Sequence, residues 1–109
     1  MKLFVDDIRK CPQGWQLART VSSAIAWLSR GVVEEISLDH DIQCSHPGCY
    51  VDCGLESFMA VAHYLALMPD RPVIRIHTGN VVAGRQMADL LGVQYNNEIF
   101  DPRNYVEAQ

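Results

Sequence analysis

The chain has 109 residues, a formal net charge of −4, 49% hydrophobic residues and 20% charged residues. This length suits one domain over residues 1–109 and leaves no room for a second, and the apolar content excludes general disorder. No apolar run approaches the ~18–20 residues of a membrane span, so no membrane partner is expected. The acidic balance argues against duplex DNA, whose phosphates require lysine and arginine.

The first predicted strand covers residues 2–5 and stops at two aspartates. Residues 8–16 contain proline and glycine and are predicted to form a loop, and residues 17–19 form a second short strand. Thr20 can cap a helix over residues 21–30, where apolar residues recur at helical spacing.

The middle of the chain repeats this alternation of strand and helix. Gly31 suits the position just after the first helix, and residues 35–38 are the next predicted strand. Residues 42–53 are interpreted as an inserted loop that is rich in cysteine and histidine. A second helix is predicted over residues 54–68.

The last predicted strand covers residues 73–76. Asn80 can cap a helix over residues 81–91, and Gly92 suits the position just past its end. Residues 93–109 are predicted to be a C-terminal tail with one edge strand.

Strands that alternate with helices imply right-handed crossovers and an α/β domain with a mostly parallel sheet of four or five strands. Helices are expected on both faces, which gives three layers. Polar residues come directly after three of the strands, and the carboxyl ends of parallel strands meet at one edge. The residues expected to converge there are Asp6, Asp7, Asp39, His40, Asp41, His77 and Thr78.

Carboxylates that are brought together repel one another unless one takes a proton or a cation lies among them. The candidate metal ligands are Asp6, Asp7, Asp39 and Asp41. Carboxylate oxygens favour Mg²⁺ or Mn²⁺, and the imidazoles of His40 and His77 extend the choice to Ni²⁺ or Zn²⁺. The alternative is ordinary capping of the turns that follow strands.

Four stretches carry a resemblance to a known family: LFVDDIR (3–9), GWQLART (14–20), ISLDHDI (36–42) and IRIHTGNVVAGRQM (74–87). In their order and spacing they resemble the cyclic-phosphate processing receiver domains, which are divergent relatives of response-regulator receivers. The resemblance runs from about residue 3 to residue 91. It implies a flavodoxin-like receiver fold with strand order 2-1-3-4-5, in which a loop replaces the first crossover helix.

The resemblance also implies roles for individual residues. Asp6 and Asp7 match the acidic pair that holds Mg²⁺ in ordinary receivers, Asp39 matches the phosphate-accepting aspartate, and Thr78 matches the hydroxyl that follows strand four. The lysine that follows strand five in ordinary receivers has no match, which argues against phosphorelay signalling through an aspartyl phosphate on Asp39.

His40 and His77 match histidines that this family has added, and by analogy the family acts on cyclic phosphates, such as 2′,3′-cyclic phosphate ends of RNA. The predicted function is a metal-dependent phosphoesterase, with Asp39, His40 and His77 as catalytic candidates. The candidates for phosphate binding are Arg9, Thr78, Asn80 and Arg85. Solvated arginines and helix capping by Thr78 and Asn80 are the alternative interpretations.

The second predicted function is a receiver-like module without catalysis, which binds a metal or docks a protein. The expected ligand of the enzyme is a small phosphorylated molecule or an RNA end. A homodimer formed through Trp15, Trp27 or the tail strand is a further hypothesis.

A second metal site is predicted in the inserted loop, because Cys44, His46, Cys49 and Cys53 follow the spacing C-x-H-x₂-C-x₃-C. These ligand types suit one structural Zn²⁺. Reduced thiols or one disulfide are the alternatives. The N-terminal residues do not form a secretory signal, so a cytoplasmic location with reduced thiols is expected.

Overall fold

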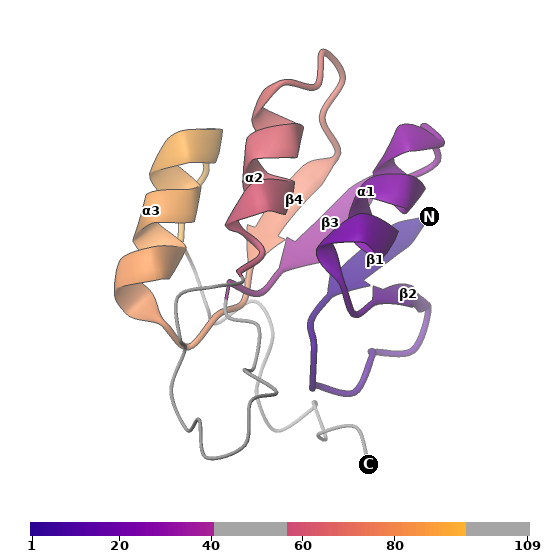
Figure 1. Ribbon diagram of the computed structural model, residues 1–109, viewed down its shortest axis with the longest axis horizontal. Helices are drawn as coiled ribbons and strands as arrows, with labels where there is room; N and C mark the ends of the chain where they lie inside the picture. The colour runs from indigo at the N-terminus through magenta and orange to yellow at the C-terminus, as the bar shows by residue number, and fades with distance from the viewer. Residues whose placement is uncertain (41–56, 96–109) are drawn as a thin grey trace.

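A computed structural model of the protein describes residues 1–40 and 57–95. These residues contain one sheet of four parallel strands in the order β2-β1-β3-β4 (Figure 1). The strands are β1 (Lys2–Val5), β2 (Trp15–Ala18), β3 (Glu35–Leu38) and β4 (Val73–Ile76). This order confirms the predicted α/β receiver-like sheet. The predicted inserted loop 42–53 and the edge strand beyond residue 95 lie outside the described residues.

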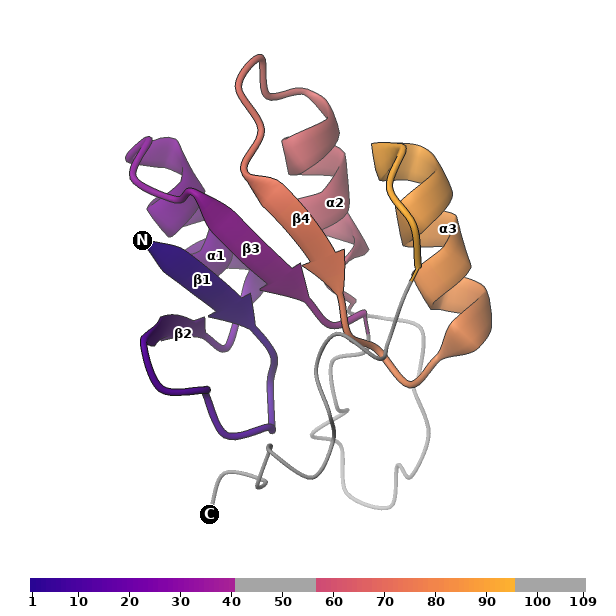
Figure 2. The ribbon, with the colours of Figure 1, turned by 180° about the vertical axis from the view of Figure 1, so that it is seen from behind.

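Three helices pack against this sheet: α1 (Val21–Ser29), α2 (Met59–Ala66) and α3 (Val81–Leu91). α1 and α2 lie in front of the strands in Figure 1 and behind them in Figure 2, and α3 packs beside α2. The described helices therefore form one layer, where helices on both faces were expected. The reason is the connection from β1 to β2, which contains no helix in the described structure, as predicted.

Local capping fixes two of the helix starts as the sequence predicts. The Thr20 hydroxyl accepts a hydrogen bond from the Ser23 backbone N–H at 3.1 Å, and the Ser23 side chain completes a capping box. Asn80 Oδ1 accepts from the Ala83 N–H at 3.1 Å. Gly31 follows α1 with φ of +71°, a conformation that costs glycine little.

Two elements, β2 and α2, have boundaries that differ from the prediction because of tertiary contacts. β2 begins at Trp15 rather than residue 17, because its parallel register with β1 pairs Trp15 with Lys2. α2 begins at Met59 and ends at Ala66, so it is shorter than the predicted helix over 54–68. Phe58 precedes it, fully buried, and donates its backbone N–H to the His40 carbonyl at 2.8 Å. The N-cap residue Phe58 has no capping side chain, and the Ser57 hydroxyl accepts the Met59 N–H at 3.3 Å.

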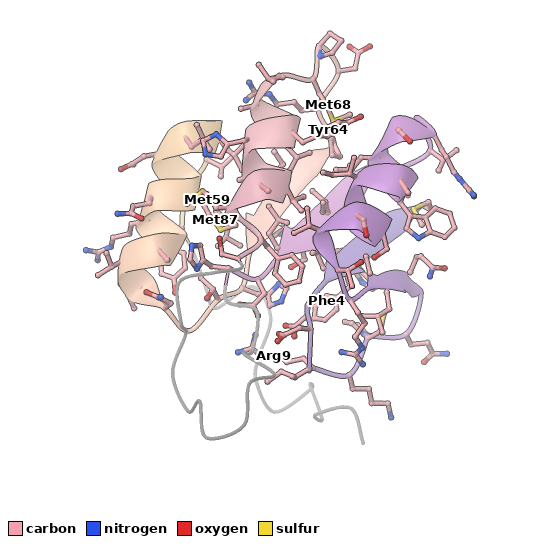
Figure 3. The ribbon with its side chains drawn as sticks, in the orientation of Figure 1. Phe4, Arg9, Met59, Tyr64, Met68 and Met87 are labelled. Atoms are coloured by element: carbon pink, nitrogen blue, oxygen red, sulfur yellow. The ribbon has the colours of Figure 1, made fainter. Side chains whose placement is uncertain are left out.

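The apolar core lies between the sheet and the helix layer. Leu3, Val5, Ile36 and Leu38 are fully buried on the two central strands. Met59 and Met87 lie between α2 and α3, and both belong to the core cluster or pack against it (Figure 3). Each large buried side chain contributes roughly 1.5–3 kcal/mol, so these strands are held firmly at their positions. No helix in the described part of the chain is long and apolar enough to cross a membrane.

The start of α3 packs closely against the segment that follows the helix. A Cβ added at Gly84 would meet the ring of Tyr95 and would lie 2.9 Å from Thr78 Cγ2. The Tyr95 hydroxyl donates a hydrogen bond to the Thr78 carbonyl at 2.5 Å. Glycine is therefore needed here for close approach, and the contact fixes the backbone just after β4.

Candidate functional site

The ends of the three neighbouring strands bring the predicted polar residues together. Val5, Leu38 and Ile76 are the last residues of β1, β3 and β4 and are paired in register. The next residue of each strand is Asp6, Asp39 or His77. The Asp39 backbone N–H donates to the Val5 carbonyl and the His77 N–H donates to the Leu38 carbonyl, both at 2.9 Å. The predicted convergence at the carboxyl edge of the sheet is therefore confirmed for these residues.

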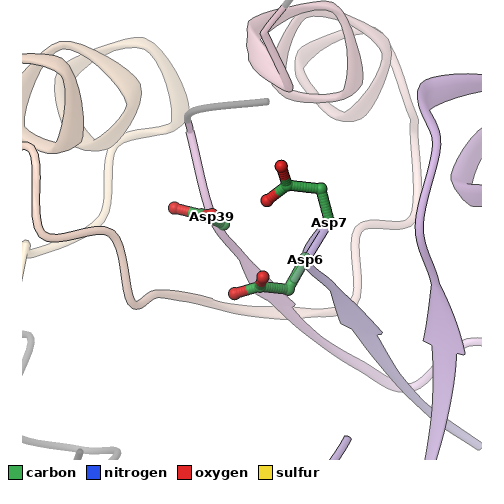
Figure 4. A group of neighbouring side chains, drawn as sticks. All are labelled: Asp6, Asp7 and Asp39. Atoms are coloured by element: carbon green, nitrogen blue, oxygen red, sulfur yellow. The ribbon is translucent and has the colours of Figure 1, made fainter. Parts of the chain in front are cut away.

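Three carboxylates gather at this edge (Figure 4). One oxygen from each of Asp6, Asp7 and Asp39 lies within 4.8 Å of the others. Asp6 and Asp39 are buried, whereas Asp7 is partly exposed. Asp41, the fourth predicted ligand, lies outside the described residues.

Asp6 is held by four hydrogen bonds. Its Oδ1 accepts from the backbone N–H groups of Ile8 and Arg9, each at 2.9 Å. Its Oδ2 accepts from Arg9 Nη1 at 3.0 Å and from His77 Nε2 at 2.9 Å. Burial alone would raise the pKa of Asp6, but the hydrogen bonds from His77 and from the backbone N–H groups of Arg9 and Ile8 outweigh it and lower the pKa to about 2. Asp6 is therefore ionised, and its roughly four lone-pair positions are all used.

Asp39 is in a different electrostatic state. Its Oδ1 accepts the His40 backbone N–H at 2.8 Å, and Arg9 Nη1 lies 3.8 Å from Oδ2. Burial and the charge of Asp6 raise the pKa of Asp39 to about 7, against the opposing effect of Arg9. Asp39 therefore exchanges a proton near neutral pH, as expected for carboxylates that share a small volume.

His77 lies beneath the carboxylates and is almost completely buried. Its Nδ1 is 2.7 Å from Ser37 Oγ, and its ring stacks on Phe4 with centroids 4.6 Å apart and an interplanar angle of 7°. Burial lowers the pKa of His77 below its usual 6.5, so the ring is neutral at pH 7. Sequence reasoning missed Ser37, although a serine within an apolar strand was a signal that could have identified it.

Arg9, which is labelled in Figure 3, contacts two of the three acids. Its Nη1 is 3.0 Å from Asp6 Oδ2 and 3.8 Å from Asp39 Oδ2, and its side chain is 32% exposed. Nη1 of Arg9 therefore lies close to two buried acids and offsets their charge, while part of the Arg9 side chain stays accessible to a ligand from solvent.

The other predicted phosphate contacts have structural partners. Thr78 is buried, and its Oγ1 accepts the Asn80 backbone N–H at 3.2 Å. Asn80 caps α3 with its side chain, whereas the Thr78 side chain also hydrogen-bonds to Asp39 at the acidic site. Arg85 is exposed on α3 and lines a shallow groove together with Asp89 and Tyr95. Phosphate binding by these residues stays a prediction.

His40 is half-buried and directly follows Asp39. Its backbone links the site to α2 through the hydrogen bond from Phe58.

The predicted zinc ligands Cys44, His46, Cys49 and Cys53 lie outside the described residues. Cys11, within them, has a free thiol that donates to the Trp15 carbonyl at 3.1 Å.

Comparison with protein families gives a match that covers nearly all of the described structure. The family model of the cyclic-phosphate processing receiver domain matches residues 1–92. The chain belongs to this family. Searches of curated proteins and of solved structures find no match. The receiver domain thus has its strand-end acids and Arg9 inside the matched region, and the sequence-based resemblance is confirmed.

Proposed function

We propose that this receiver domain is a metal-dependent phosphoesterase that opens a cyclic phosphate, such as a 2′,3′-cyclic phosphate of a nucleotide or an RNA end. The observation that supports it most is the meeting of Asp6, Asp7 and Asp39 at the strand ends, with Arg9 in contact with the same acids. The family description names cyclic-phosphate processing for domains of this kind.

The acidic residues suit a hard divalent cation such as Mg²⁺ or Mn²⁺, because carboxylate oxygens from three residues lie within 4.8 Å of one another. All lone-pair positions of Asp6 are occupied, so Asp7 and Asp39 would hold the cation, with Asp6 beside them. Both ring nitrogens of His77 are hydrogen-bonded, which favours an oxygen-liganded cation over Ni²⁺ or Zn²⁺. When bound, the cation would supply charge neutralisation and an activated water.

The protein's own residues would bind the phosphate and handle the proton. The exposed part of Arg9 can pair with a phosphoryl oxygen. In the overall reaction, water oxygen forms a new bond to phosphorus, one ring P–O bond breaks, and the departing ester oxygen receives a proton. His40 directly follows Asp39 in the chain, and an imidazole is the side chain best suited to this proton transfer. We therefore assign this proton transfer to His40.

The test is turnover of a 2′,3′-cyclic nucleotide by metal-stripped protein to which Mg²⁺, Mn²⁺, Ni²⁺ or Zn²⁺ is returned. We expect phosphomonoester product with Mg²⁺ or Mn²⁺ and none with EDTA. His40→Gln should lower kcat by about 10²–10⁴-fold. His63→Gln, which makes the same change at an exposed histidine on α2, should match the unsubstituted protein. Absence of product with every metal contradicts the proposal.

One observation favours the second candidate, a receiver-like module without catalysis. Arg9 already supplies a positive charge between Asp6 and Asp39, so the acidic residues can coexist without a metal. In that case Arg9 would be a structural counter-ion and the surface would serve for binding only. Metal-dependent turnover distinguishes the two functions, because the module predicts none.

A further inference from the structure

We propose that Ser37 and His77 are positioning residues, which hold Asp6 in one orientation through a buried hydrogen-bond chain. The chain runs from Ser37 on β3 through the His77 ring after β4 to Asp6 after β1. It joins three adjacent strands beneath the acidic residues. This inference rests on the proposed function, because what it positions is the site for the cation and the phosphate.

The hydrogen-bond chemistry fixes the direction of the chain. An ionised carboxylate can only accept hydrogen bonds, so His77 Nε2 must carry the hydrogen that Asp6 Oδ2 receives. In a neutral imidazole the other nitrogen then has a lone pair, so Nδ1 accepts the hydrogen of the Ser37 hydroxyl at 2.7 Å. Ser37 and Asp6 therefore specify the same tautomer from opposite sides.

Packing holds the ring in this position. Ser37 and Asp6 are fully buried, and His77 is 5% exposed. The nearly parallel stack on Phe4 restricts rotation of the imidazole. The Phe4 ring itself packs edge-on against Trp15, with ring centroids 6.4 Å apart. A buried donor aimed at a buried carboxylate is costly to lose, so the arrangement is rigid.

The rigidity matters because Asp6 also holds Arg9. Oδ2 of Asp6 accepts from both His77 and Arg9, so a shift of this oxygen would move the guanidinium away from Asp39. Groups that orient the carboxylates and ligands of a metal site typically change affinity or activity by about 10–100-fold when removed. His77 acts in the same way, through Asp6, and not as a proton donor to the substrate.

Paired substitutions of His77 separate positioning from proton transfer. His77→Gln places an amide N–H near the former position of Nε2 and keeps a donor for Asp6. The shorter side chain of His77→Asn places its amide near the former position of Nδ1, where it can contact Ser37 but leaves Asp6 without this donor. Neither amide can exchange a proton near neutral pH. Because the effect passes through Asp6 to Arg9, we expect Gln to keep kcat/KM on the cyclic nucleotide within about threefold. Asn and Phe should lose about 10-fold or more of kcat/KM while Mn²⁺ affinity is kept. Ser37→Ala should lower kcat/KM by a smaller factor, about three- to tenfold.

The measurements are Mn²⁺ binding by electron paramagnetic resonance, kcat and KM on the cyclic nucleotide, and ring ¹⁵N shifts of His77. The shifts should show a protonated Nε2 and an unprotonated Nδ1. Ser29→Ala on the exposed side of α1 is the matched control for Ser37. If Gln loses as much turnover as Phe while the unsubstituted protein is active, or if Nδ1 carries the proton, positioning is overturned and the proposed function stands. If the unsubstituted protein neither binds Mn²⁺ nor turns over substrate, both fail.

Discussion

Asp39→Asn is expected to stabilise the metal-free protein at pH 8 while it abolishes metal-dependent turnover. In the folded protein burial and the charge of Asp6 raise the pKa of Asp39 from 3.8 to about 7. Between these two values the folded state keeps a proton that the unfolded chain has lost, so this group's contribution to stability falls as pH rises. Asparagine removes that cost, which is on the order of 2–4 kcal/mol at pH 8.

The measurement is urea unfolding at pH 5 and pH 8 in EDTA, repeated with Mg²⁺. Asp39→Asn should gain most stability at pH 8 and less than half of that gain at pH 5. It should gain nothing from added Mg²⁺, whereas the unsubstituted protein should be stabilised by Mg²⁺. Asp70→Asn makes the same charge change at an exposed position and should be neutral. A destabilised Asp39→Asn protein at pH 8, or one that still responds to Mg²⁺ and turns over substrate, contradicts this assignment.

Arg9→Gln is expected to separate substrate binding from cation binding. Loss of the guanidinium removes a positive charge beside Asp6 and Asp39, so cation affinity should stay the same or rise. The same loss removes the proposed phosphate contact, and kcat/KM should fall by about 10²-fold. Arg9→Lys keeps the charge but not the planar fork, and should recover only part of the activity.

Calorimetric titration with Mg²⁺ and steady-state kinetics on the cyclic nucleotide check this separation. Arg30→Gln serves as the control, because Arg30 is exposed at the end of α1. Parallel losses of cation affinity and turnover in Arg9→Gln would show that Arg9 only supports the fold of the site. Kinetics equal to those of Arg30→Gln would remove Arg9 from phosphate binding.

Much of the fold was predictable because its signals are local. Short apolar runs predicted all four strands of the described sheet, and Thr20 and Asn80 predicted two helix starts through their side-chain caps. The N-cap residue of α2 is Phe58, which is held by burial and not by a capping side chain, so the pattern placed this helix start too early. The start of β2 was set by its register with β1, which a single strand does not show.

The site was predictable to the same extent, and for the same reason. Parallel strands bring the residues after their ends together, so Asp6, Asp39 and His77 could be grouped from strand positions alone. Which partner each side chain takes depends on burial in three dimensions. The hydrogen bonds from Ser37 to His77 and from His77 to Asp6 join residues up to 71 positions apart. No spacing in the sequence indicates these contacts.

The central claim, that the strand-end carboxylates hold a divalent cation, is tested most directly by anomalous scattering from crystals of the protein soaked in Mn²⁺. We predict a manganese peak within bonding distance of carboxylate oxygens of Asp7 and Asp39, with Asp6 still hydrogen-bonded to His77 and Arg9. The peak should be absent from crystals of Asp39→Asn grown in the same way. Crystals of the unsubstituted protein that show no manganese at these residues at saturating concentration would contradict the claim.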